Sequence, residues 1–119
     1  MTVVLVDALN VLRSTWPNIP APELVELCGK WAEREDVRAV VVFDGSAPDV
    51  DAGERVELVS TGGESADDWI AREAASLRKR GEPFRLVTSD RELRSRASQG
   101  AEQVVGGGTF ARTLLDLRS

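Results

Sequence analysis

The sequence predicts an α/β fold: a three-layer α/β/α sandwich with a central, mainly parallel sheet. The main indication is a set of short apolar runs rich in valine, which are typical of strands covered by helices on both faces. These predicted strands lie at 3–6, 38–43 and 84–88. Segments with helical spacing alternate with them, and this order favours parallel strands joined by right-handed crossovers.

The first long helix is predicted over about 22–35. Pro20 and Pro22 mark its start, because proline fits the first turn of a helix, and apolar residues follow them at helical spacing. Trp31 and Cys28 fall on the apolar side, so both are expected in the core. Cys28 is the one cysteine, which excludes an internal disulfide and favours a buried thiol.

The second half of the chain continues the alternation of strands and helices. A helix over 66–80 ends at Gly81, and Pro83 follows it, as expected beyond a helix end. The connection at 44–55 shows no helical pattern, so the strand after it is expected at an edge of the sheet or in an unexpected direction. The other predicted elements are a strand at 56–60, a helix at 91–98, a strand at 102–105 and a terminal helix from about 109 to 117.

Length and composition predict a single domain over residues 1–119. The chain has 42% hydrophobic and 29% charged residues, which is typical of a soluble globular protein. No apolar run is long enough to span a membrane, and the first residues do not form a signal-type stretch. The cytoplasm is therefore the expected location, with no membrane partner.

The charge distribution bears on nucleic-acid binding in two opposing ways. A net charge of −5 argues weakly against it, whereas eight of the fifteen basic residues fall between positions 72 and 96. Arg91 is the candidate among them for contact with a flanking phosphate, and a solvated surface is an equally favoured interpretation. Trp16 is the candidate for stacking on a base, although a packing role is slightly favoured.

Acidic residues follow three of the predicted strands. Asp7, Asp44 and Asp90 each end an apolar run, and the carboxyl ends of parallel strands meet at one edge of a sheet. Two carboxylates about 4 Å apart repel by roughly 4 kcal/mol at an effective dielectric near 20, so such a cluster needs a cation or raised pKa values. The chain has no histidine, and a site made of oxygen ligands suits Mg²⁺ or Mn²⁺.

A fourth acidic step, Asp67 and Asp68, opens the predicted helix over 66–80. Ser65 and Asp68 have the spacing of a capping box, which gives Asp68 a structural role. Asp67 has no part in that box and can point toward the strand ends. We therefore expect Asp67 to be the metal ligand of the pair.

Polar residues near these acids have competing interpretations. Asn10 can orient a phosphate or a water beside Asp7, or belong to an ordinary turn. Ser89 forms a second predicted capping box with Glu92, and the amides of that helix start can also attract phosphate. The three glycines at 106–108 are expected to form a flexible turn rather than a ligand contact.

Four motifs in order resemble the YacP-like branch of the NYN domains, within the PIN-like nucleases. They lie at 6–11 (VDALNV), 42–45 (VFDG), 65–70 (SADDWI) and 87–90 (VTSD), so the resemblance covers essentially the whole chain. It implies a PIN-like sandwich and metal-dependent endonuclease activity on RNA. The implied catalytic residues and metal ligands are Asp7, Asp44, Asp67 and Asp90. The implied polar helpers, which position water or phosphate, are Asn10, Thr88 and Ser89.

We therefore expect an endoribonuclease that uses Mg²⁺ or Mn²⁺ and cuts single-stranded or accessible RNA. One or two ions held by the acids would lower the pKa of a bound water that attacks the phosphate. One alternative is a non-catalytic RNA-binding or ribosome-associated module. Another is a small-molecule phosphohydrolase or a receiver-like domain, although no lysine follows Val105, where a receiver domain would need one.

Overall fold

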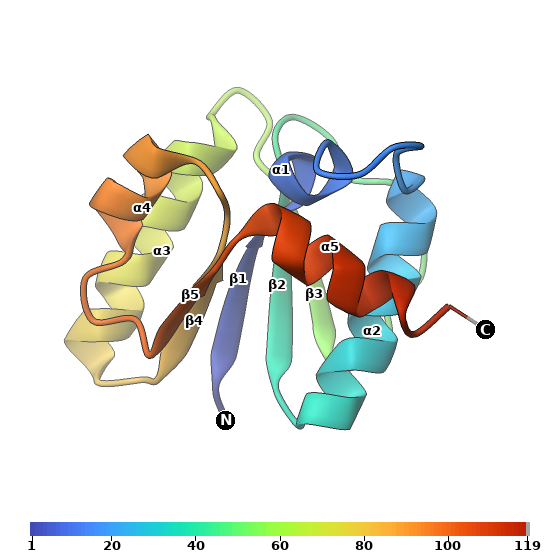
Figure 1. Ribbon diagram of the computed structural model, residues 1–119. Helices are drawn as coiled ribbons and strands as arrows, with labels where there is room; N and C mark the ends of the chain where they lie inside the picture. The colour runs from blue at the N-terminus through green and yellow to red at the C-terminus, as the bar shows by residue number, and fades with distance from the viewer. Residues whose placement is uncertain (119) are drawn as a thin grey trace.

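The computed structural model describes residues 1–118 and contains a five-stranded sheet in which all neighbouring strands are parallel (Figure 1). The strand order is β3-β2-β1-β4-β5. The strands are β1 (Val3–Asp7), β2 (Arg38–Phe43), β3 (Val56–Ser60), β4 (Phe84–Val87) and β5 (Gln103–Val105). The helices are α1 (Ala8–Leu12), α2 (Ala21–Glu35), α3 (Ala66–Arg80), α4 (Arg91–Ala97) and α5 (Gly107–Leu115). The predicted α/β/α architecture is confirmed.

The helices cover both faces of the sheet (Figure 1). Alternate residues of a strand point to opposite faces, so Val4 and Val6 of β1 join one apolar cluster while Leu5 joins the other. The first cluster contains α1, α2 and α5, and the second contains α3 and α4. Burial of the strands on both faces explains why the apolar runs do not alternate with polar residues.

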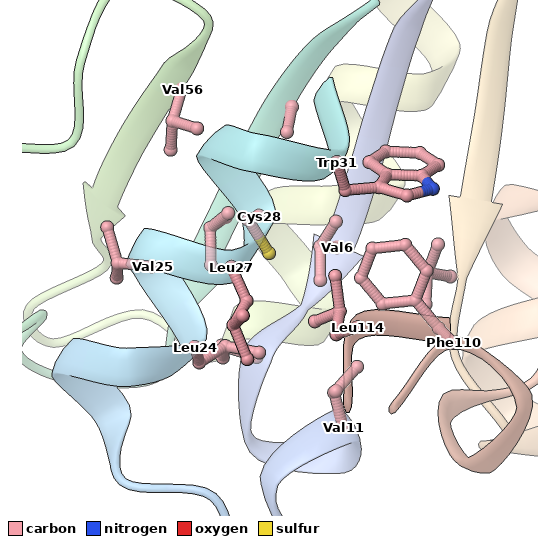
Figure 2. Close-up of a cluster of buried hydrophobic side chains, with 14 of the residues drawn as sticks. Val6, Val11, Leu24, Val25, Leu27, Cys28, Trp31, Val56, Phe110 and Leu114 are labelled. Carbon is pink, nitrogen blue, oxygen red and sulfur yellow. The ribbon is translucent and has the colours of Figure 1, made fainter. Parts of the chain in front are cut away.

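Helices α2 and α5 meet through aromatic side chains in the first cluster. Figure 2 shows Trp31 of α2 beside Phe110 of α5, with Val6 and Leu114 close by. The two rings pack edge to face, with centroids 4.9 Å apart and an interplanar angle of 87°. The predictions that Trp31 and Cys28 lie in the core are confirmed, and burial raises the pKa of the Cys28 thiol to about 12.

Three features of the fold bear on the predicted elements. Strand β3 lies at an edge of the sheet and is parallel to β2, so the first of its two predicted placements is correct. Helix α1 was not predicted, and it starts directly after β1. Helix α5 starts at Gly107, so the prediction of a flexible glycine turn at 106–108 is wrong. Within residues 1–118, no helix has the length and apolar character needed to cross a membrane.

Candidate active site at the carboxyl edge of the sheet

The strand order reverses between β1 and β4. From β1 the chain builds outward through β2 and β3, then returns to place β4 on the other side of β1. The connections on the two sides of the sheet diverge there, and open α/β sheets generally bind ligands at the carboxyl ends of the strands at such a reversal. Asp7 ends β1, and Thr88 directly follows β4. The register pairs Val6 with Val87, so Asp7 and Thr88 lie side by side at this position.

Thr88 holds the carboxylate of Asp7. Both side chains are buried, with 7% of Asp7 and none of Thr88 exposed. The Thr88 hydroxyl donates a hydrogen bond of 2.9 Å to Asp7 Oδ2 and accepts one of 3.1 Å from the backbone N–H of Asp90. A hydroxyl with a donor on one side can direct its own proton to the other, so Thr88 fixes the orientation of Asp7.

The predicted acids act on one another electrostatically. Burial raises the pKa of Asp7, and the nearby carboxylates of Asp67 and Asp90 raise it further, against the lowering effect of the Thr88 hydrogen bond. Burial also raises the pKa of Asp67, with added repulsion from Asp90 and Asp44, while Arg96 opposes the shift. The structure therefore brings Asp7, Asp67 and Asp90 to one edge, and Asp44, which directly follows β2, also affects the pKa of Asp67.

The donor chemistry of this edge fits a hard divalent cation, because carboxylate oxygens that repel one another gain most from a bound cation. Across residues 1–118, no three side chains of the acidic, histidine and cysteine types are placed so that they could hold a metal ion together. Mg²⁺ keeps several waters and often takes only one or two protein carboxylates directly. A site of that kind needs fewer carboxylates than the four predicted.

Asp67 and Asp68 have different surroundings. Ser65 is the N-cap of α3, and its hydroxyl accepts a hydrogen bond of 3.1 Å from the backbone N–H of Asp68, as the predicted capping box requires. The Asp68 carboxylate accepts a bond of 2.8 Å from Arg96, which holds the pKa of Asp68 below its usual value. Asp67 forms no such pair and lies among the other acids.

The capping prediction for α4 is wrong. Asp90, and not Ser89, is the N-cap, and Asp90 Oδ1 accepts a hydrogen bond of 3.0 Å from the backbone N–H of Leu93. The Ser89 hydroxyl is used elsewhere, because it accepts a bond of 2.8 Å from the N–H of Gly107 at the start of α5. One oxygen of Asp90 is thus committed to the helix, and the other is left for a cation.

Asn10 connects α1 to the segment after β4. Its Oδ1 accepts a hydrogen bond of 2.9 Å from the backbone N–H of Ser89. The amide nitrogen is the donor of this side chain and is the atom that can bind a phosphate oxygen. Gly107 packs against the Oδ1 atom, since a Cβ at this position would lie 2.1 Å from it. Sequence reasoning missed Gly107, whose only signal was its place in a glycine run after the last strand.

Gly107→Ala is expected to destabilise the protein by about 1–3 kcal/mol and to lower activity, because the new methyl group must displace Asn10. Urea unfolding measures the stability. Gly108→Ala is the matched control, since a Cβ there meets its nearest atoms at the ordinary distances of 3.7 and 3.8 Å. Equal stability of the two variants would show that Asn10 moves aside without cost.

Half of the eight basic residues predicted to flank the acids are paired with carboxylates. The arginines that form salt bridges in this region are Arg72, Arg80, Arg85 and Arg96. Their carboxylate partners favour the solvated-surface interpretation for them, whereas Arg91 is exposed at the start of α4 and forms no salt bridge within residues 1–118. Trp16 is 90% exposed, so a packing role in the core is wrong for it.

The comparisons with known proteins show the family and the fold. The sequence profile of the YacP-like NYN domain matches residues 4–114. Two crystal structures of Rae1 (YacP) from Bacillus subtilis, one of them a mutant, have the same fold, each with a TM-score of 0.75. Their sequences are 22% and 23% identical to this chain, and the alignments cover 98% of it and 77% and 75% of those chains. No curated protein matches significantly.

Proposed function

Because the chain belongs to the YacP-like NYN domain family, a family of PIN-like nucleases, we propose that it is a metal-dependent endoribonuclease. The observation that carries the proposal is the buried carboxylate of Asp7 at the reversal of strand order, where Asp67 and Asp90 raise its pKa. Burying a carboxylate beside two others is costly unless a ligand repays it, and a cation that also binds a phosphate does so.

Asp7 and one of its acidic neighbours, Asp67 or Asp90, would hold Mg²⁺ or Mn²⁺ directly, since no three such side chains within residues 1–118 are placed to do so together. The remaining acids, Asp44 included, would act through waters bound to the ion. The ion would supply a water of lowered pKa and would neutralise charge growing on the phosphate. Thr88 keeps the Asp7 carboxylate in place through its hydroxyl. Asp67, whose pKa is raised, accepts a proton more readily than an ordinary aspartate at the pH of the cell.

The shape of the site supports an RNA substrate. The acids lie along an open edge, and none of them lines the broad surface groove of about 1040 Å³ between α2 and residues 50–55. A small-molecule enzyme normally encloses its substrate in a pocket, whereas an open edge admits a strand. Trp16 is an exposed aromatic side chain after α1, and a base can stack on its free face. RNA with unpaired bases is therefore the proposed substrate.

Labelled single-stranded RNA is expected to be cut in the presence of Mn²⁺, and a duplex of the same sequence is expected to stay intact. The physical reason is that a rigid duplex cannot bring one strand into contact with a buried carboxylate at the sheet edge. Gel analysis after incubation measures both. Chelator is the control and should stop cleavage. Equal cutting of the two substrates would contradict the proposal of a single-stranded substrate.

A non-catalytic RNA-binding module is the second candidate. It is favoured by one observation, that no three side chains of metal-binding type within residues 1–118 are placed to hold an ion together. This candidate predicts RNA binding without cleavage by Mg²⁺ or Mn²⁺ at any concentration. Cleavage that disappears in Asp7→Asn would exclude it.

A further inference from the structure

Two arginines near the candidate active site form no salt bridge, unlike most of the basic residues in the described part of the chain. Within residues 1–118, nine of the basic side chains form salt bridges with carboxylates. Arg94 of α4 and Arg112 of α5 form none, although the chain is acidic overall. The positive charge of an arginine without a carboxylate partner is not compensated by a neighbour, and the donors that it does not use within the protein can bind a ligand.

Arg94 is held beside the acids. Its Nε donates a hydrogen bond of 2.8 Å to the backbone carbonyl of Thr88, the residue whose hydroxyl binds Asp7. Its Nη2 lies next to Gly106, 3.5 Å from the point where a Cβ of that residue would be. The side chain is half-buried, so its guanidinium is fixed in position before any ligand arrives.

Arg112 lies close to the same backbone segment, Gly106–Gly108. Its Nη1 is 3.7 Å from the position of a Cβ on Gly108, and its Nη2 makes only a long contact of 3.4 Å with the Thr109 hydroxyl. Gly106 and Gly108 are two residues apart, which corresponds to roughly 5 Å at the start of a helix. Gly106 and Gly108 add no side chain beside the two guanidinium groups, whereas the space at Gly107 is filled by Asn10 and Ser14.

We propose that Arg94 and Arg112 form a binding site for the phosphodiester backbone of the RNA, along Gly106–Gly108 and next to the acids. This inference rests on the proposed function and names the residues that hold the substrate. Guanidinium groups bind phosphate oxygens through two parallel hydrogen bonds, which suits a chain of phosphates. The site also offsets the repulsion that a phosphate would otherwise meet from Asp7 and its neighbours.

The test is the binding of a short single-stranded RNA in chelator, measured by fluorescence anisotropy between about 50 and 200 mM salt. Arg112→Ala and Arg94→Gln are each expected to weaken binding by about tenfold. Each should also reduce the slope of log affinity against log salt by about 0.7, the value for one lost phosphate contact on a single strand. Lys79→Ala is the matched control, because it also removes one positive charge. Lys79 lies at the C-terminal end of α3, near the amino end of β4 and away from the acids at the carboxyl ends of the strands.

The outcomes separate the inference from the proposed function. If the parent cuts RNA but Arg112→Ala binds it with the same affinity and the same salt slope as the parent, the phosphate site is wrong and the proposed function stands. The same holds if Lys79→Ala weakens binding as much as Arg112→Ala does. A parent that neither binds nor cuts RNA overturns both. Arg112 is exposed with one weak contact, so Arg112→Ala decides the question even if Arg94→Gln melts early through loss of the bond to Thr88.

Discussion

Asp7→Asn is expected to lose RNA cleavage and, in chelator, to melt at a higher temperature than the parent protein. The carboxylate of Asp7 is buried, and Asp67 and Asp90 repel it. Asparagine is similar in shape and can still accept the hydrogen bond from Thr88, but it carries no charge. The substitution therefore removes the cost of the buried charge and keeps the contact.

The pH dependence of stability follows from the raised pKa of Asp7. A carboxyl group whose pKa is raised in the folded state binds more protons when folded than when unfolded. The free energy of unfolding therefore falls as the pH rises from the usual value of 3.8 through the raised pKa of Asp7. Asp7→Asn lacks this contribution, so its advantage over the parent should grow across that interval and then stay constant at higher pH.

Metal ions should reverse the difference in melting temperature between the parent and Asp7→Asn. Mg²⁺ or Mn²⁺ that binds only the folded parent raises its stability by about 2.7 kcal/mol at one hundred times the dissociation constant. The variant should respond much less, because it lacks one ligand. Thermal scans of the two proteins with and without metal measure this.

Asp49→Asn is the control for the change in net charge, since Asp49 is exposed on the connection before β3. If Asp7→Asn melts at a lower temperature than the parent in chelator, and metal raises both melting temperatures equally, Asp7 has a structural role and is not a metal ligand.

Asp67→Asn is expected to lower cleavage by about a hundredfold or more while the fold is kept. Asp67 is among the acids, and its pKa is raised by burial and by repulsion from Asp90. Removing this charge should leave the stability in chelator unchanged or higher. Cleavage rates at saturating RNA and melting temperatures measure the two effects.

Asp68→Asn is the matched control, because it removes an equal charge from the adjacent residue. It breaks the pair with Arg96, so a lower melting temperature with most of the cleavage retained is expected. The reverse result, in which Asp68→Asn loses cleavage and Asp67→Asn does not, would make Asp68 the ligand.

The strands and the acids at their ends were predictable because the signals are local. A buried strand is a run of apolar residues, and the residue after it lies at the edge of the sheet whatever the rest of the chain does. Helix α1 was missed because its five residues, ALNVL, are too few to show a helical period. The start of α5 was missed because glycine disfavours helices, and its presence at 107 is explained only by the contact with Asn10.

The choice of N-cap for α4 needed information that local sequence does not hold. Serine and aspartate are equally good N-cap residues, so Ser89 and Asp90 compete. The choice follows the bond that Ser89 makes with Gly107, 18 residues later in the chain. The pairing of basic side chains such as Arg85 and Arg96 with carboxylates distant in the sequence is likewise a property of the folded surface.

The hydrogen bond between Thr88 and Asp7 joins residues 81 positions apart in the chain. Strands β1, β2 and β3 can pair with one another early in synthesis, but Asp7 has no partner hydroxyl until β4 has emerged and inserted beside β1. Ser89 and Gly107 are joined later still. Closing so long a loop is slow compared with forming local contacts. The contacts of the site therefore need the chain to have been made up to Gly107, and a chain that ends before β4 carries Asp7, Asp44 and Asp67 but lacks Thr88 and Asp90.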